Sequence, residues 1–200
     1  MGETFMRSPN KVEKLAYLYG PTYYTPKVKM CGISKVETIP AIVDAKPDYM
    51  GLVFAPSKRQ VTVDQAKTLV DELHKQYAKI YGTNTVPMNV EATQDTNGFG
   101  EENISSEAIK TVGVFVNETL DNLVTIAKEV NLDAVQLHGD EDEAFIQSLK
   151  ERTNVEVWKA VQICSAADAE AWIDSSADML LFDAYHKDER GGTGEVFDWS

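Results

Sequence analysis

Short runs of β-type residues alternate with segments whose apolar residues recur at helical spacing along most of this chain. Such alternation is typical of βαβ units, which build a parallel sheet that is either doubly wound or closed into a barrel. The pattern by itself leaves those two architectures open. The expected strands are residues 27–33, 48–54, 111–116, 133–138, 155–161 and 178–184.

The segments between the expected strands show where helices should lie and begin. Two clear apolar stripes are formed by Ala66, Leu69, Val70 and Leu73 and by Leu120, Leu123, Ala127 and Val130. Capping-box spacing, which satisfies free amides at a helix start, occurs at Ser34 with Glu37, Thr62 with Gln65, and Asp140 with Glu143. Pro40 lies inside the first helical segment, so that helix either begins near Thr38 or is kinked.

Two segments stand outside the repeat. We expect residues 1–26 to be an amino-terminal arm or extension, and residues 27–200 to form one barrel-type domain. Residues 80–109 contain five acidic residues and no Lys or Arg, which predicts an acidic, solvated loop insertion, with a substrate lid as the alternative.

Composition excludes several classes of function. The chain has 19 Lys and Arg against 32 Asp and Glu, a formal charge of −13, so nucleic-acid binding is not expected. No apolar run approaches the roughly 18 residues of a membrane span. The two cysteines, Cys31 and Cys164, form no disulfide framework, and no His/Cys cluster has metal-ligand spacing. We expect a cytoplasmic protein without a metal or other cofactor; the sequence leaves its oligomeric state open.

Two reactive residues follow the first and last expected strands. In a parallel barrel, reactive groups lie where strands end and the following loops begin. Cys31 is placed there on the first strand and Asp183 on the sixth, and together they form a candidate acid–base pair. Taken singly, Cys31 could be a small buried hydrophobe and Asp183 a loop acid or helix cap. Lys29, two residues before Cys31, would favour a thiolate on the same strand face, or would belong to an inner polar layer.

Further polar residues follow other strands. Arg59, after the second strand, could hold a carboxylate through its planar guanidinium, although an exposed loop arginine is often only solvated. His138, after the fourth strand, could donate a hydrogen bond or titrate near neutral pH, or be structural. The loop Gly191–Gly194 is compatible with a mobile flap and lacks the Lys and Ser/Thr of a nucleotide-binding P-loop.

Six motifs taken together resemble one family. KMCGIS, GLVFAPSKRQV, VGVFVNE, DAVQLHGDE, LLFDA and GGTGEVFDWS have the order and spacing seen in phosphoribosylanthranilate isomerases of tryptophan biosynthesis. The resemblance runs from about Lys27 to Ser200 and implies a (β/α)8 barrel. It also implies the Amadori rearrangement of N-(5-phosphoribosyl)anthranilate, a small phosphorylated substrate, without a cofactor.

The resemblance implies a role for each matching residue. Cys31 resembles the general base that takes the proton from C2 of the sugar, and Asp183 the general acid that protonates the ring oxygen. Arg59 matches the residue that holds the anthranilate part of the substrate. Gln136 and His138 lie in a strand end that lines the pocket, and the loop beginning at Gly191 and Gly192 resembles a flap over the substrate.

The number of repeats differs from the family's pattern. About six βα units begin before Ser200, whereas such a barrel has eight, and its phosphate site lies after strands seven and eight. We expect the reading frame to continue beyond Ser200. The alternatives are that a second chain completes the barrel, that the chain is a non-catalytic remnant or binding module, or that it is another phosphosugar barrel enzyme.

Overall fold

The structure, a computed structural model, describes residues 26–81, 108–163 and 166–184. The sheet has six parallel strands in the order β1-β2-β3-β4-β5-β6, which is also their order along the chain. The strands are β1 (Lys29–Cys31), β2 (Tyr49–Val53), β3 (Lys110–Phe115), β4 (Ala134–Leu137), β5 (Glu156–Ile163) and β6 (Met179–Ala184). Each expected strand is confirmed, with no end shifted by more than two residues.

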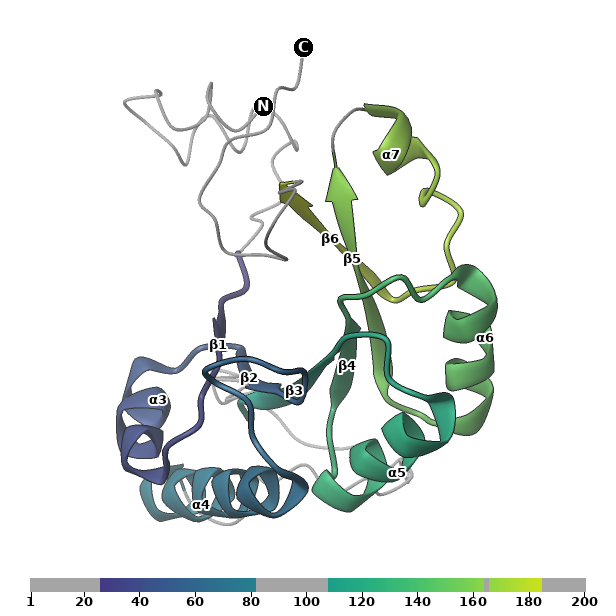
Figure 1. The fold of residues 1–200 in the computed structure, drawn as a ribbon. Helices are drawn as coiled ribbons and strands as arrows, with labels where there is room; N and C mark the ends of the chain where they lie inside the picture. Colours follow the sequence, from purple (N-terminus) through teal and green to yellow (C-terminus); the bar gives the residue numbers. More distant parts are fainter. Residues whose placement is uncertain (1–25, 82–107, 164–165, 185–200) are drawn as a thin grey trace, which may run out of the picture.

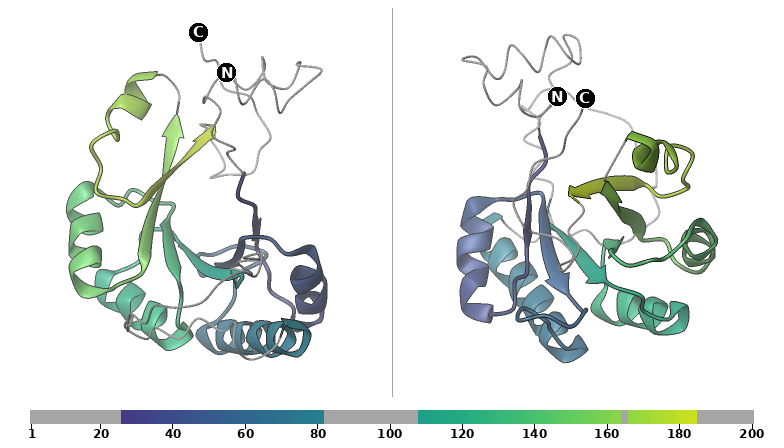
Figure 2. Two further views of the ribbon diagram at one scale, coloured as in Figure 1. Left: turned by 180° about the vertical axis from the view of Figure 1, so that it is seen from behind. Right: turned by 45° about the horizontal axis from the view of Figure 1, so that its top comes forward.

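The helices lie on the outside of this sheet, which curls into a half-barrel (Figures 1 and 2). Sequential strand order with the helices on one face is the arrangement of a barrel, because a doubly wound sheet reverses its strand order and carries helices on both faces. The helical elements are η1 (Val36–Thr38), α3 (Ile39–Ala45), α4 (Val63–Tyr81), α5 (Leu120–Val130), α6 (Glu143–Arg152) and α7 (Ala166–Glu170).

Alternate residues along each strand pack into two separate cores. One side of each strand packs against the helices, where Met50, Leu52 and Val135 meet the apolar stripes expected for α4 and α5. The opposite side faces the inside of the curl, where Tyr49 packs edge-on against Trp158 at a ring-centroid distance of 4.8 Å. Strand alternation therefore separates a helix-facing core from an inner surface that leads to the rim of the barrel.

The start of α4 confirms one expected capping box. Thr62 N donates to Gln65 Oε1 at 2.9 Å, and Gln65 N donates to Thr62 Oγ1 at 3.2 Å. Near Pro40, the structure selects the first of the two alternatives: α3 begins at Ile39, so the proline lies in the first turn, where its missing N–H costs nothing.

The other two expected capping boxes are wrong. Ser34 caps no helix, because a 3₁₀ turn precedes α3 and no side chain caps either element. At α6 the cap is Asp142, which accepts from Phe145 N at 2.9 Å. Glu143 instead reaches across to the loop before β6, where hydrogen bonds from Ser176 and Ser175 lower its pKa to about 2. At Ser34 a 3₁₀ turn takes the place of the expected helix start. At Glu143 contacts with residues distant in sequence replace the expected local pairing.

Aspartates just before β2, β4 and β6 tie each of these strands to the one before it. Their Oδ2 atoms accept backbone N–H bonds in three pairs: Val28 N to Asp48 at 2.6 Å, Thr111 N to Asp133 at 2.7 Å, and Val157 N to Asp178 at 2.7 Å. The carboxylate thus satisfies a donor at the amino-terminal edge of the sheet.

We expect Asp133→Ala to lower the free energy of unfolding by about 1–3 kcal/mol, because it leaves Thr111 N–H and its hydroxyl without this acceptor at a position that is 1% exposed. Asp133→Asn keeps an acceptor oxygen and should lose less. Urea unfolding measures both variants, with the exposed Asp71→Ala on α4 as the control. A loss no larger than that of the control would contradict this role.

Several sequence expectations fall outside the described residues. These are the arm 1–26 apart from Pro26, nearly all of the insertion 80–109, Cys164, and the glycine loop with Gly191 and Gly192. Within the described ranges, no helix is long and apolar enough to cross a membrane.

Candidate active site

The carboxyl ends of the strands bring the expected reactive residues to one rim. Cys31 ends β1 on the same side as Lys29, and Asp183 lies near the end of β6 on the same side as Leu181, which packs on the inner core. Gln136 lies on β4, and His138 directly follows that strand. The chain therefore places a thiol, a carboxylate, an amide and an imidazole around the mouth of the curled sheet.

The Cys31 thiol is exposed and depends on a glycine beside it. Gly51 is its partner in the β1–β2 register, and a Cβ added at Gly51 would lie 2.7 Å from Cys31 Sγ. The chain then turns sharply at Gly32, with φ of +81°, and the amides of Gly32 and Ile33 both donate to Gly51 O. A glycine at position 51 therefore gives the thiol its room.

Arg59 lies over the same turn. A Cβ added at Gly32 would meet Arg59 Cδ at 2.5 Å and Nη1 at 3.2 Å, so the guanidinium lies next to the residue that follows Cys31. Gln60 Nε2 donates to Phe54 O at 2.9 Å, and this hydrogen bond fastens the loop after β2 to the end of that strand. This places a planar cation beside the turn that follows Cys31.

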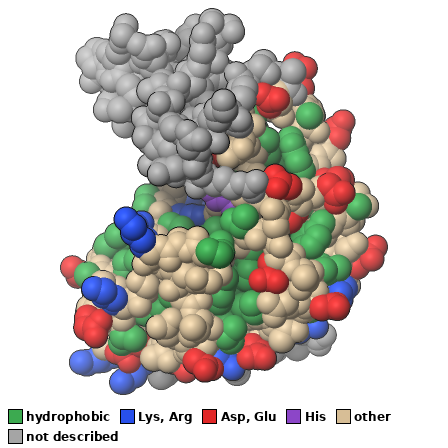
Figure 3. Space-filling model, in the orientation of Figure 1, with side chains coloured by type: hydrophobic (Ala, Val, Ile, Leu, Met, Phe, Trp, Pro, Cys, Tyr) green, Lys and Arg blue, Asp and Glu red, His purple; other side chains and the backbone are tan. Residues whose placement is uncertain are grey.

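Because the chain as a whole is acidic, an anionic ligand could bind only where positively charged side chains lie together. Figure 3 shows acidic side chains along the edge over α6 and α7, while a histidine and a basic side chain are visible in the hollow between the two ends of the sheet. Arg59 and Lys29 contribute positive charge on this side. An anionic ligand would therefore meet local cations despite the formal charge of −13.

His138 and Asp183 face each other across the rim. His138 Nε2 lies 3.4 Å from Asp183 Oδ2, and the side chains are 18% and 30% exposed. Nε2 is buried and has no well-aligned hydrogen-bond partner in the part of the chain that the structure describes. Burial lowers the pKa of His138 despite the opposing effect of Asp183, which favours the neutral imidazole.

The Lys29 ammonium has partners other than the Cys31 thiol. Its Nζ donates to Gln136 Oε1 and lies 5.6 Å from the centroid of the Trp158 ring. Gln136 Nε2 in turn lies 3.2 Å from His138 Nδ1. Burial lowers the pKa of Lys29, and the nearby Cys31 opposes this. The inner polar layer offered as the alternative for Lys29 is present, and the thiol remains within its electrostatic reach.

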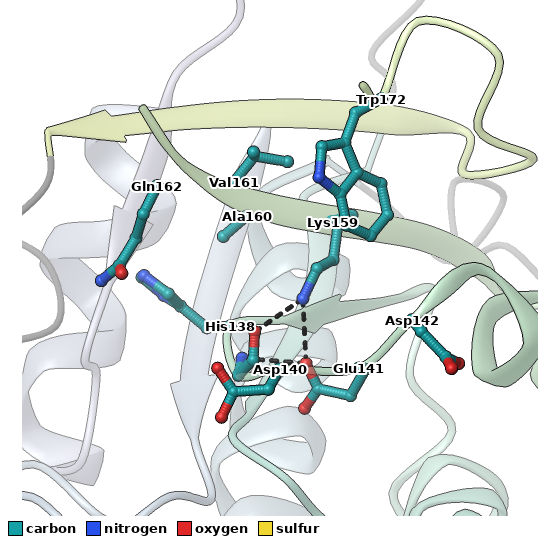
Figure 4. A pocket seen from close by; sticks show the side chains of 10 residues that line it. His138, Asp140, Glu141, Asp142, Lys159, Ala160, Val161, Gln162 and Trp172 are labelled. Carbon is teal, nitrogen blue, oxygen red and sulfur yellow. Dashed lines mark hydrogen bonds and ion pairs between the residues drawn. The ribbon is translucent and has the colours of Figure 1, made fainter. Parts of the chain in front are cut away.

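A buried ion pair behind the rim was not found from the sequence. Lys159 Nζ lies 3.1 Å from Glu141 Oε2 and donates to Gly139 O at 2.7 Å (Figure 4). Glu141 also accepts from Asn117 N at 2.7 Å and from Gly139 N at 2.9 Å. The pair joins β5, the loop after β3 and the loop after β4 that carries His138. A lysine in the middle of the apolar run VEVWKAV was the available signal.

A cavity of about 340 Å³ lies beside this pair, between the loop after β4, the second half of β5 and Trp172. Figure 4 shows Gln162 and the His138 ring on one side of this lining, and Lys159 and Trp172 on the other. Among the described residues, no group of three or more His, Cys, Asp or Glu side chains could hold a metal ion. Of the residues expected at the rim, His138 lines this cavity, whereas Cys31, Arg59, Gln136 and Asp183 are not among its lining residues.

The fold and this rim define an α/β-barrel enzyme equipped for acid–base chemistry. Residues 83–200 match the family model described as N-(5'phosphoribosyl)anthranilate (PRA) isomerase. The N-(5'-phosphoribosyl)anthranilate isomerase of Thermoanaerobacter sp. (strain X514) is 38% identical over 173 residues, which cover 86% of this chain and 68% of that protein. The chain belongs to the N-(5'-phosphoribosyl)anthranilate isomerase family.

Two further comparisons agree. The enzyme of the same name from Clostridium acetobutylicum is 37% identical over 87% of this chain and 68% of its own length. The solved phosphoribosyl anthranilate isomerase of Thermotoga maritima is 28% identical, with a TM-score of 0.62 over 88% of this chain and 69% of its own. Family membership confirms the resemblance read from the six motifs and decides against the other phosphosugar barrel families.

Proposed function

We propose that Asp183 and Cys31 supply the acid and the base for the Amadori rearrangement of N-(5-phosphoribosyl)anthranilate to 1-(2-carboxyphenylamino)-1-deoxyribulose 5-phosphate. The observation that carries this proposal is their placement on the inner side of one rim, at opposite ends of the curled sheet. A solved phosphoribosyl anthranilate isomerase, 27% identical with a TM-score of 0.57, is a complex with reduced 1-(O-carboxyphenylamino)-1-deoxyribulose 5-phosphate. That ligand supports a product of this class here.

In the acid step, the Asp183 carboxyl gives its proton to the oxygen of the furanose ring. The bond between C1 and the ring oxygen breaks, and the nitrogen lone pair forms a C=N bond, so the open chain is a protonated Schiff base. A general acid is needed because the ring oxygen would otherwise leave as an alkoxide. The Asp183 side chain is 30% exposed, which leaves it accessible from the mouth.

In the base step, the Cys31 thiolate takes the proton from C2. The C–H electrons form the C1=C2 bond, and the C=N electrons return to nitrogen. The resulting enolamine becomes the aminoketone when C1 gains a proton and the C2 hydroxyl loses one. A base of moderate strength suffices, because the cationic nitrogen acidifies the neighbouring C–H. The thiol must be reduced to act, as thiols are in the cytoplasm.

The remaining rim residues orient the substrate in this proposal. Arg59 holds the anthranilate carboxylate through paired N–H donors, supported by its position over the turn that follows Cys31. Gln136 and His138 line the pocket from β4. Gly191 and Gly192 lie outside the described residues, and their role as a flap over the substrate rests on the motif resemblance alone.

We expect Cys31→Ala to lower kcat by at least ~10²-fold, because the C2 proton then has no positioned base. Met30→Ala is the matched control: Met30 is adjacent on β1, its side chain points to the other side of the strand, and activity should stay near the parent level. Steady-state conversion of N-(5-phosphoribosyl)anthranilate measures both variants. Near-parent turnover of Cys31→Ala, with folding confirmed by circular dichroism, would exclude the thiol as the base.

A further inference from the structure

We infer that Lys29 is a positioning residue for the acid step, acting through Gln136 to hold His138 in the tautomer that carries its hydrogen on Nε2, the ring nitrogen that lies 3.4 Å from Asp183 Oδ2. The inference rests on the role proposed above for Asp183. It assigns a function to a chain of contacts that crosses the mouth from β1 through β4 to β6.

The first contact fixes the orientation of the Gln136 amide. A lysine ammonium has three donors and no acceptor, so only the carbonyl oxygen of an amide can face it. Lys29 Nζ therefore binds Oε1, and the Gln136 NH₂ is turned the other way, toward His138. The assignment of oxygen and nitrogen on this side chain follows from its neighbour.

The second contact fixes the proton on the imidazole. The Gln136 NH₂ has only donors, and it lies 3.2 Å from His138 Nδ1, so Nδ1 must carry the lone pair. A neutral imidazole with a free Nδ1 has its hydrogen on Nε2. The opposite tautomer would bring two donors together at Nδ1. Rotating the amide to avoid this would place its NH₂ against the Lys29 ammonium.

The third contact connects this tautomer to the acid. Nε2 is buried, has no other partner among the described residues, and lies 3.4 Å from Asp183 Oδ2. At this distance Oδ2 is the acceptor that an Nε2–H can reach, and once the contact is aligned it orients the carboxyl group and leaves Oδ1 to carry the proton that is passed to the ring oxygen. The charged groups that act on His138 are Asp183 from β6, Lys29 from β1 and Lys159 from β5. Burial is the largest cause of the lowered pKa of His138, and both lysines lower it further, against Asp183.

The test reads the tautomer directly from the ring ¹⁵N resonances of His138, assigned by comparison with His138→Gln. In the parent protein we expect a protonated Nε2 and an unprotonated Nδ1. In Lys29→Met, the Gln136 amide is free to turn its oxygen to Nδ1, and the ratio of the Nε2–H to the Nδ1–H tautomer should fall at least tenfold. Lys29→Arg keeps a donor-only cation and should restore the parent spectrum.

Lys110→Met is the matched control. Lys110 is also a strand lysine, but its Nζ pairs with Glu156 Oε1 at 2.8 Å, away from the imidazole. Its removal should leave the His138 spectrum unchanged. Gln136→Glu gives a second test that keeps Lys29. The introduced carboxylate can accept from Lys29 with one oxygen and from His138 with the other, so the ring hydrogen should move to Nδ1. An Nδ1–H tautomer in the parent, or an unchanged tautomer in both Lys29→Met and Gln136→Glu, would overturn the inference.

Turnover separates this inference from the function on which it rests. We expect kcat of Lys29→Met to fall at least tenfold with KM changed less than about threefold, and Lys29→Arg to recover it; an incorrect histidine tautomer in a catalytic triad costs as much as ~10⁴-fold. If the tautomer shifts but Asp183→Asn remains active, the acid assignment fails alone. If Asp183→Asn is inactive but the tautomer does not shift, the role of Lys29 fails alone.

Discussion

Asp183→Asn is expected to lower kcat for N-(5-phosphoribosyl)anthranilate by roughly 10²–10⁴-fold. The amide has the shape of the carboxyl group and can still accept from His138 Nε2, 3.4 Å away in the parent, but it cannot transfer a proton to the ring oxygen. Because only the transition state for ring opening uses that proton, kcat and kcat/KM should fall together while KM changes little.

Two variants make this result specific. Asp183→Glu keeps a proton donor but displaces it by one methylene, so its loss should lie between those of the parent and Asp183→Asn. Asp174→Asn removes an exposed carboxylate from the connection before β6 and should leave the kinetics unchanged. Thermal unfolding checks that all three variants fold. If Asp183→Asn turned over substrate at the parent rate, the acid would have to be another group.

The strands and the rim were predictable because they depend on local patterns. Alternation within each apolar run sets which side chains face the inside, and this alone places Lys29 with Cys31 and Asp183 with Leu181. The carboxyl ends of parallel strands meet at one edge, so residues far apart in the sequence could be assigned to one mouth. The same patterns did not decide between a barrel and a doubly wound sheet, which depends on strand order.

The contacts that organise the site were not predictable because they join elements distant in sequence. Lys29 and Gln136 are 107 residues apart, and nothing near either one indicates the other. Asp140 has the spacing of a helix cap, yet its N–H donates to Asn117 Oδ1 at 2.7 Å, and the helix begins after Asp142. Local spacing shows only which nearby hydrogen bonds are possible. Here Asp140 bonds to a residue distant in sequence instead of capping the helix.

The buried pair of Lys159 with Glu141 should produce the largest stability effect in the chain. Both side chains are 3% exposed, so each charge relies on the other and on nearby backbone groups. Removing one partner of a buried pair leaves an uncompensated charge and typically costs about 3–5 kcal/mol. We expect this loss in the free energy of unfolding for Lys159→Met, measured by urea denaturation.

A matched pair and a double variant test whether burial is the cause. Lys67 and Glu129 have the same 3.1 Å separation but are 43% and 49% exposed, so Lys67→Met should cost at most about 1 kcal/mol. In the double variant Lys159→Met with Glu141→Gln, the isolated carboxylate is neutralised while one side-chain oxygen still accepts from the Asn117 or Gly139 amide. It should therefore recover part of the stability lost in Lys159→Met. Two results would contradict this. Lys159→Met and Lys67→Met could lose equal free energy of unfolding, or the losses of the two single changes could simply add in the double variant. Either would mean that backbone contacts, and not the buried charges, hold the loops at the rim.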